Sequence, residues 1–126
     1  REVVRIDEDN VLALNNLAWY IRTENPAQAL EYARHASTLE KDSSAVLDTL
    51  AVVEYANEQY TQAKRSVQRA LKLTPNNPSM RYHKAMISAA LGENPVAREI
   101  LDELFESGAE FPELAQARQL RKSLKR

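Results

Sequence analysis

The stretch that decides the fold is residues 44–77, SAVLDTLAVVEYANEQYTQAKRSVQRALKLTPNN. Apolar and small side chains recur in each half at spacings of three and four residues, which is the period of an α-helix and not that of a strand. The positions that carry this pattern are Leu47, Leu50, Ala51 and Tyr55 in the first half, and Ala63, Val67, Ala70, Leu71 and Leu73 in the second. The stretch therefore predicts two amphipathic helices joined by a short turn.

The same pattern returns on either side of this stretch at an interval of about 34 residues. Residues that align at this interval are Ala29, Ala63 and Ala97; Ala36, Ala70 and Leu104; and Asp9, Ser43 and Asn77, each just ahead of a predicted helix. The pairs Leu17–Ala18, Leu50–Ala51 and Lys84–Ala85 align as well, although the first spacing is 33. One residue is therefore missing from the first unit, between Ala18 and Ala29. Self-similarity at an interval of this length is the signature of a stack of helical units.

The interval divides the chain into three units, residues 11–43, 44–77 and 78–111. Residues 1–10 are expected to be the end of a preceding unit's second helix and its loop, with Ile6 in the place that Leu39 and Leu73 take later. Residues 112–126 are expected to form one helix that caps the open end of the stack with charged side chains. The chain begins with Arg1, so we expect it to be a piece of a longer array.

Helix starts and stops agree with these boundaries. The pairs Asn25–Pro26, Asn77–Pro78 and Asn94–Pro95 each combine an N-cap residue with a first-turn proline. Gly92 and Gly108 stand where helices are expected to end, because glycine adopts the left-handed conformation of a helix C-terminus without penalty.

The motif in these units resembles the tetratricopeptide repeat. The second unit carries it best, as Leu50, Ala51, Tyr60, Ala63, Ala70 and Pro75. The third unit departs from it at Lys84, where a large apolar residue is usual, and the first departs at Lys41, where proline is usual, and in its shortened turn. The resemblance implies an all-α solenoid of antiparallel helix hairpins, wound as a right-handed superhelix, with about three full repeats and a capping helix.

Four short strings also resemble the C-terminal part of the long tetratricopeptide proteins of bacterial exosortase (PEP-CTERM) systems. They are Asn15-Asn16-Leu17-Ala18-Trp19, Ala45-Val46-Leu47-Asp48-Thr49-Leu50, Arg81-Tyr82-His83 and Phe111-Pro112-Glu113. This resemblance implies a role in the cell envelope or periplasm, in the export of exopolysaccharide and surface proteins. Without it, a cytoplasmic location is expected.

Composition excludes several classes of function. The formal net charge is −1 and the pI is about 6.2, which argues against nucleic acid as the main partner, because phosphate binding needs a basic excess. There is no cysteine, so disulfides and thiolate chemistry are excluded. No run of about 18 apolar residues could span a membrane. With two isolated glycines there is no phosphate-binding loop.

No set of residues predicts catalysis, a metal site or a cofactor. The two histidines, His35 and His83, fall in different units, and no second histidine or cysteine stands by to share a metal. His35 is expected to have a surface or helix-packing role. The acidic cluster Asp102, Glu103 and Glu106 is expected to be a solvated outer face, and the basic residues that end the chain are expected to favour the negative end of the last helix.

The inner face of the stack is the predicted binding surface. In tetratricopeptide repeats the first helices line the concave groove, and side chains one turn apart on them point into it. The expected groove residues are Asn15, Asn16, Trp19, Arg22, Asp48, Thr49, Val52, Tyr55, Ser79, Tyr82, His83 and Met86. The positions that hold a basic carboxylate clamp in some family members are Asn15, Trp19, Thr49, Ser79 and His83 here, so that clamp is absent. Other family members bind a peptide backbone through a series of asparagines along the groove. Here at most one residue of such a series is present, at Asn16.

This groove composition favours an apolar extended segment or a helix as the ligand, since aromatic anchors dominate interface energy. The sequence therefore predicts a protein–protein interaction scaffold without enzymatic activity. Two alternatives stay open. Trp19 and Tyr55 can instead pack between neighbouring hairpins, whereas Tyr60 is expected to be a core residue at its hairpin turn. The chain can also be a structural segment that stacks on further repeats or on itself.

Overall fold

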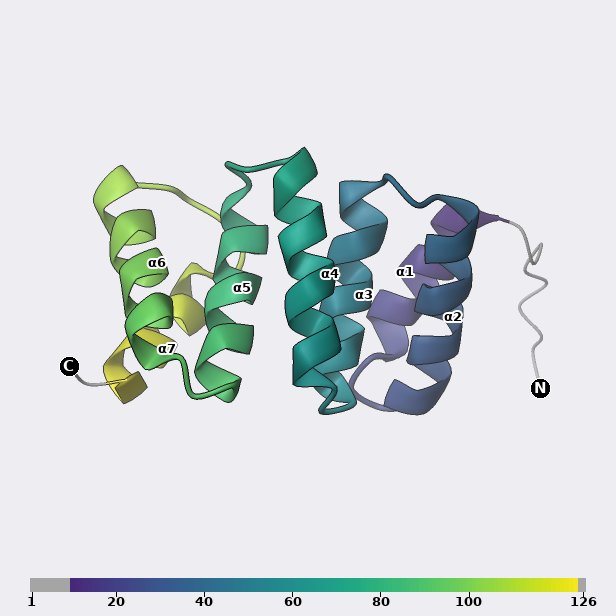
Figure 1. Cartoon of the computed structure of the whole chain (residues 1–126), viewed down its shortest axis with the longest axis horizontal. Helices are drawn as coiled ribbons and strands as arrows, with labels where there is room; N and C mark the ends of the chain where they lie inside the picture. Colours follow the sequence, from purple (N-terminus) through teal and green to yellow (C-terminus); the bar gives the residue numbers. More distant parts are fainter. Residues whose placement is uncertain (1–9, 125–126) are drawn as a thin grey trace.

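The computed structural model describes residues 10–124, and within that range the chain consists of seven helices without strands (Figure 1). The helices are α1 (Val11–Ile21), α2 (Pro26–Leu39), α3 (Ser44–Ala56), α4 (Tyr60–Leu73), α5 (Pro78–Ala90), α6 (Asn94–Ser107) and α7 (Leu114–Leu124). They stack as successive hairpins along one axis, from α1 and α2 at one end to α6 and α7 at the other. The prediction of an all-α helical repeat fold is confirmed.

The first helices of the three hairpins begin at Val11, Ser44 and Pro78, the first residues of the three units that the sequence defines. The missing residue of the first unit is accounted for by two changes. α1 has 11 residues where α3 and α5 have 13, and the turn after it, residues 22–25, is one residue longer than residues 57–59 and 91–93. Ile6 and the rest of 1–9 lie outside the described residues.

Alanines fill the places where two helices of a hairpin cross. Ala18, Ala51 and Ala85 on the first helices are fully buried, as are Ala29, Ala63 and Ala97 on the second helices. A methyl group lets two backbones approach closely, and a larger side chain would push them apart because helical interiors are close-packed. Leucine, valine and isoleucine side chains, among them Leu47, Val67, Ile87 and Leu101, fill the space between these contacts.

Asparagine and serine residues begin four of the helices. The side chains of Asn10, Asn25, Ser43 and Asn77 each accept a hydrogen bond from the backbone N–H three residues on, which satisfies a group that has no partner inside the helix. Asn10, and not Asp9, is thus the residue that corresponds to Ser43; Asp9 lies outside the described residues.

The prediction that Asn94 is an N-cap is wrong. α6 begins at Asn94 itself, and the N-cap is Glu93, whose side chain makes no capping bond. The reason is the tight turn before α6, in which Gly92 has a φ of 82° and Glu93 N–H donates to Ser88 O. Because of this turn, α6 begins at Asn94, one residue before the predicted start at Pro95. The turn before α4 is built the same way, with Glu58 in the left-handed conformation at φ 63° and Gln59 N–H bonded to Glu54 O.

The repeat register continues into the last helix. Pro112 and Glu113 stand where Pro78 and Ser79 stand one unit earlier, although α7 begins at Leu114. α7 packs on α5 and α6 through Ala117, Leu120 and Leu124. Arg121 Nε donates to Asp102 Oδ1 on α6 at 2.8 Å. The acidic cluster of α6 is therefore partly engaged, since Glu103 also pairs with Arg81.

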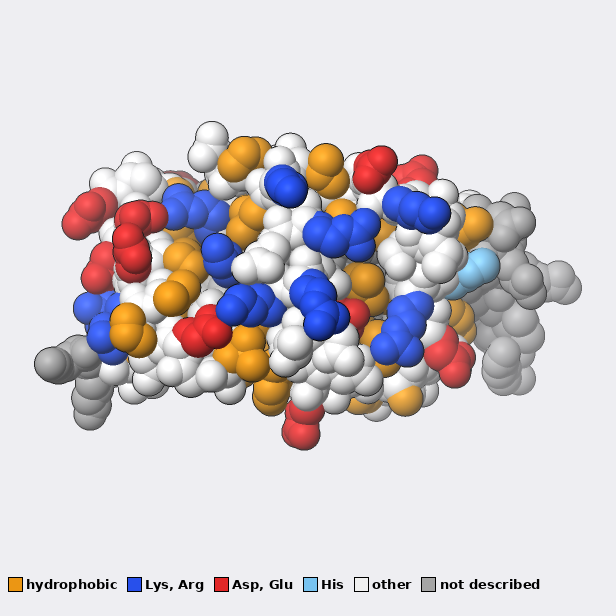
Figure 2. Space-filling view, in the orientation of Figure 1, with side chains coloured by type: hydrophobic (Ala, Val, Ile, Leu, Met, Phe, Trp, Pro, Cys, Tyr) orange, Lys and Arg blue, Asp and Glu red, His pale blue; other side chains and the backbone are white. Residues whose placement is uncertain are grey.

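Cations gather on the face that α4 shares with its neighbours (Figure 2). α4 carries four cations and no carboxylate, namely Lys64, Arg65, Arg69 and Lys72. Lys64 pairs with Glu93 at 2.9 Å. By contrast α6 holds one cation, Arg98, and four carboxylates. Across residues 10–124, every helix falls short of the length and hydropathy that a bilayer crossing requires.

Candidate partner-binding groove

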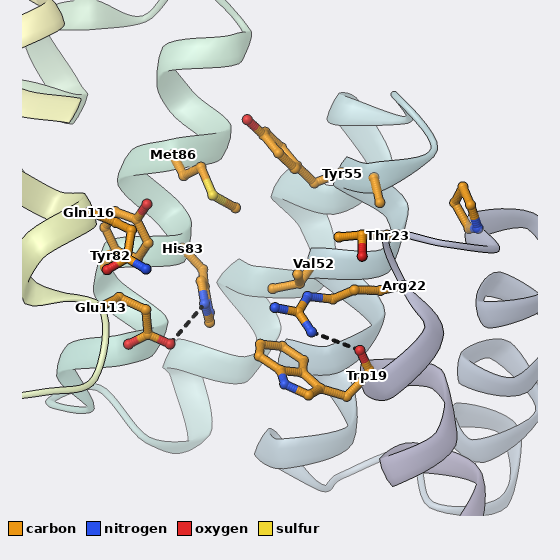
Figure 3. Close-up of a pocket in the computed structure, with 12 residues that line it drawn as sticks. Trp19, Arg22, Thr23, Val52, Tyr55, Tyr82, His83, Met86, Glu113 and Gln116 are labelled. Atoms are coloured by element: carbon orange, nitrogen blue, oxygen red, sulfur yellow. Dashed lines mark hydrogen bonds and ion pairs between the residues drawn. The ribbon is translucent and has the colours of Figure 1, made fainter. Parts of the chain in front are cut away.

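A cavity of about 450 Å³ opens between the first helices of the stack and α7 (Figure 3). Its wall consists of Trp19, Arg22, Thr23, Pro26, Val52, Tyr55, Ala56, Tyr82, His83, Met86, Glu113 and Gln116. The size is that of a pocket for a drug-sized ligand, about 300–1,000 Å³. More than one side chain of a bound segment would therefore fit.

Seven of the twelve expected groove residues lie in this wall: Trp19, Arg22, Val52, Tyr55, Tyr82, His83 and Met86. They come from α1, its C-cap, α3 and α5, so the stack brings together residues that are as much as 67 positions apart in the sequence. The register accounts for part of this set, because Trp19, Val52 and Met86 occupy equivalent positions in the three units, as do Arg22 and Tyr55 in the first two.

The other five do not line the cavity. Asp48 and Thr49 are buried, and Asn16 is exposed on α1. Asn15 is half-buried, and its Oδ1 has no hydrogen-bond partner among the described residues. Ser79 is half-buried and donates to Glu113 Oε1 at 2.8 Å.

His83 is the centre of a buried polar network. Its Nδ1 lies 2.9 Å from Asp48 Oδ1, and its Nε2 lies 3.7 Å from Glu113 Oε2. Because a carboxylate only accepts hydrogen bonds, Nδ1 is the N–H of this pair and donates a hydrogen bond to Asp48. The network links α3, α5 and the start of α7.

Aromatic rings surround His83. The ring centroids of Trp19 and His83 are 6.0 Å apart, and those of Tyr82 and His83 are 5.7 Å apart. Trp19 therefore both packs between units and borders the cavity. Tyr55 also borders the cavity, and its ring lies 5.4 Å from that of Tyr60, which is half-buried at the turn of the same hairpin.

Arg22 stacks on Trp19. Its guanidinium carbon lies 3.9 Å from the centroid of the Trp19 ring, and Nη1 donates to Trp19 O at 2.7 Å. Burial lowers the pKa of Arg22, while the Glu113 carboxylate acts in the opposite direction. Burial also raises the pKa values of Tyr55 and Tyr82, so both phenols enter the cavity wall in the neutral form.

Sequence reasoning missed the residues that α7 and the first turn contribute. Glu113 and Gln116 come from the last helix and its approach, Thr23 lies in the turn after α1, Pro26 begins α2 and Ala56 ends α3. The signal for Glu113 was present, because the repeat interval places it one unit after Ser79 and thus at a groove position in the next unit.

Little at this site resembles an active centre. Ser79 Oγ donates to Glu113, and the group beside His83 Nε2 is the Glu113 carboxylate at 3.7 Å, so His83 is not paired with a nucleophilic hydroxyl here. Among the described residues, no group of three His, Asp or Glu side chains is placed to hold a metal ion. His35 lies exposed on α2, away from the cavity.

Comparison with solved structures places the chain among helical repeat proteins. It is similar to MamA, with 21% identity and a TM-score of 0.76 over 94% of this chain and 68% of that one. It is also similar to the Yersinia enterocolitica type III secretion chaperone SycD, solved in complex with a peptide of the translocator YopD, with 20% identity and a TM-score of 0.75 over 97% of each chain. PcrH, solved with the chaperone binding region of PopD, gives 17% identity and a TM-score of 0.75 over 98% of this chain and 96% of that one.

A search of curated proteins found no match. A tetratricopeptide repeat family model matches residues 54–120, which is more than half of the chain and includes two of the three hairpins in whole or in part. The model, the repeat interval and the stacked hairpins agree, and the chain belongs to the tetratricopeptide repeat family.

Proposed function

We propose that this chain is a non-catalytic scaffold that binds a segment of a partner protein in the groove between α1, α3, α5 and α7. The observation that carries the proposal is the cavity itself, whose wall is rich in aromatic and apolar side chains. Residues such as Trp and Tyr in a partly desolvated concave site are the ones that dominate the energy of protein–protein contacts.

The structural neighbours support this reading at the level of the fold. SycD was solved with a peptide of YopD, and PcrH with the chaperone binding region of PopD. Both share the fold of this chain over nearly its whole length. At 17–20% identity they support segment binding as a mode of action but give no partner for this chain.

A finer proposal is that the segment belongs to a bacterial envelope or export apparatus of the exosortase type. The four strings that resemble such proteins supply Trp19, Asp48, Tyr82, His83 and Glu113. All five of these residues belong to the cavity wall or to the His83 network beside it. Each of the four strings therefore contributes at least one residue where a ligand would be held, which supports a shared ligand class.

A random peptide library selected on the purified chain tests segment binding. Peptides selected by the wild type should lose most of their affinity for Trp19→Ala and for Tyr82→Ala, since truncating an interface aromatic typically costs about 1–4 kcal/mol. Leu73→Ala, on the exposed end of α4, is the matched control and should bind as the wild type does. A library that yields no binder, or binders indifferent to both groove variants, would exclude the groove as a binding site.

A second candidate function is self-association through an exposed stripe of α1. One stripe recurs on the first helices: Leu12, Asn16 and Tyr20; Ala45, Thr49 and Val53; Ser79, His83 and Ile87; and Glu113, Ala117 and Arg121. In the second and third units the stripe packs on the preceding unit, and Val53 and Ile87 are each 0% exposed. On α1, Tyr20 is 79% and Leu12 is 70% exposed.

We infer that a second copy of the chain covers this stripe, because the equivalent stripes are the surfaces through which the units already bind one another. Sedimentation velocity at rising concentration should show a dimer that the double variant Leu12→Ser/Tyr20→Ser abolishes. The control is Leu73→Ser/Val96→Ser, which removes two exposed apolar side chains elsewhere. A monomer at all concentrations would rule out this candidate.

A further inference from the structure

Two opposite charges face the cavity from its two ends (Figure 3). Arg22 stands at the end of α1, and Glu113 stands just before α7. His83 lies between them, and Val52 and Tyr55 of α3 and Met86 of α5 form an apolar part of the wall beside it. The cavity thus has a cationic end, an anionic end and an apolar part of its wall.

Arg22 is held ready for a ligand. The stacking on Trp19 and the bond from Nη1 to Trp19 O fix the plane of the guanidinium, which has five N–H donors in all. Within residues 10–124 no carboxylate lies at ion-pair distance from it. A fixed and half-buried cation without an anionic partner binds a carboxylate with little loss of side-chain entropy.

Glu113 is fixed in the same way. Oε1 accepts from Ser79 Oγ at 2.8 Å, and Oε2 lies 3.7 Å from His83 Nε2. Its side chain is 20% exposed. An ionised carboxylate can accept about four hydrogen bonds, so these two contacts leave capacity for a cationic group that enters the cavity.

The two groups cannot neutralise each other across the cavity. The Glu113 carboxylate opposes the lowering of the Arg22 pKa by burial, yet the two form no ion pair. Among the described residues Arg22 therefore has no carboxylate partner, and it lies in a wall with apolar side chains, where charge complementarity to a ligand has more effect than in open solvent.

We propose that the cavity selects segments in which an apolar side chain stands between an acidic group and a basic group, the acidic group binding Arg22 and the basic group binding Glu113. This inference rests on the proposed function, since it names the chemistry of the segment that the groove binds. It also accounts for the missing carboxylate clamp. The cation of this groove comes from the end of α1, outside the positions where the clamp residues of other family members lie.

The charge pattern of peptides selected from a random library tests the proposal. The wild type should enrich peptides that carry both an acidic and a basic residue beside the apolar anchor. Arg22→Gln should lose the acidic enrichment and keep the basic one, and Glu113→Gln should do the reverse. Gln at 113 keeps an acceptor for Ser79. Arg34→Gln, on the exposed face of α2, is the control and should select as the wild type does.

A binding cycle on one selected peptide makes the test quantitative. Changing its acidic residue to the amide should weaken binding to the wild type about fivefold, as partly exposed ion pairs do, and should leave binding to Arg22→Gln unchanged. Helical circular dichroism confirms that each variant is folded.

The outcomes separate this inference from the proposed function. Binders that depend on Trp19 and Tyr82 but show no charge pattern would overturn the inference and leave segment binding intact. The inference would also be overturned if changing the peptide's acidic residue to the amide reduced the affinity for the wild type and for Arg22→Gln equally. If the library yields no binder at all, segment binding fails and the charge rule falls with it.

Discussion

The imidazole of His83 donates from Nδ1 to the carboxylate of Asp48, 2.9 Å from Oδ1 and 3.0 Å from Oδ2, and so ties α5 to α3 beneath the groove. Both residues are buried. A bond of this kind adds modestly to stability when it is made, but removing one partner leaves the other charged or polar group buried without a substitute for water.

Replacing His83 by phenylalanine should therefore destabilise the fold. His83→Phe keeps a ring beside Trp19 and Tyr82 but removes the donor to Asp48, and we expect a loss of about 3 kcal/mol in the free energy of unfolding. The double variant Asp48→Leu/His83→Phe replaces both partners and should recover much of that loss. Urea unfolding followed by circular dichroism measures both. If the stability loss of the double variant equalled the sum of the losses of Asp48→Leu and His83→Phe, the two side chains would not interact.

The turns before α4 and α6 allow a matched test of backbone strain. Glu58 at φ 63° and Gly92 at φ 82° occupy the same place in consecutive units. A residue with a Cβ costs about 1 kcal/mol in the left-handed conformation. Glu58→Gly should raise the free energy of unfolding by up to about 1 kcal/mol.

The reciprocal change is Gly92→Ala, which should lower the free energy of unfolding by about 1 kcal/mol. No atom lies within 4 Å of a Cβ built at Gly92, so the cost comes from the backbone alone. Thermal or urea unfolding of the two variants gives the comparison. A destabilised Glu58→Gly would mean that the contacts of the Glu58 side chain outweigh the strain.

The buried carboxyl group of Glu54 should make the stability of the fold depend on pH. Burial raises the pKa of this carboxyl, and the hydrogen bond from Ser66 and the charges of Arg34 and Arg65 oppose the shift. The folded chain therefore binds this proton more tightly than the unfolded chain, whose glutamate pKa is about 4.3. The stabilisation is complete below that value and is lost as the pH rises through the raised folded pKa.

Glu54→Gln should remove the pH-dependent contribution of this side chain to the free energy of unfolding. The amide oxygen still accepts from Ser66, and no charge has to be buried, so the variant should gain stability relative to the wild type at about pH 7 and change little at about pH 4. Urea unfolding at the two pH values measures the difference. Lower stability at neutral pH would indicate that attraction to Arg34 and Arg65 exceeds the cost of burial.

Docking of α7 should depend on Ala117. This side chain is fully buried against α5 and α6, while Ala115 two residues earlier is exposed. Ala117→Glu places a charge in that contact and should release α7, so that its amides exchange with solvent about tenfold faster or more. Hydrogen exchange read by mass spectrometry follows each helix separately. Ala115→Glu is the control, and equal protection in both variants would contradict the docking.

The repeat interval was enough to predict the helices of this chain because each unit repeats the same packing problem. Alanine must stand where two helices cross, and Ala51 and Ala63 mark the crossing in the second hairpin as Ala18 and Ala29 do in the first. Helix starts were predicted correctly where a capping asparagine stands directly before a proline at the first helical position, as at Asn25 and Asn77. The prediction failed at Asn94, because the backbone turn at Gly92, and not a capping side chain, sets the start of α6.

The site was harder to predict than the fold. Counting along first helices finds the residues on the inner side, such as Trp19 and Tyr82, but not how deeply the next unit buries them. Asp48 is buried and bonded to His83 of α5, and Thr49 is buried in the stripe that packs on the preceding unit. Glu113 was missed because α7 was interpreted as a solvated cap alone, whereas its approach also closes one end of the cavity.

The uneven charge of the second helices has a consequence for handling the protein. The formal net charge is −1, but an ion-exchange surface responds to the local potential, within about one Debye length of roughly 10 Å at 0.1 M salt. The four cations of α4, which no carboxylate on that helix balances, should hold the chain on a cation exchanger at neutral pH. A chain with an acidic isoelectric point would then elute as a basic protein does.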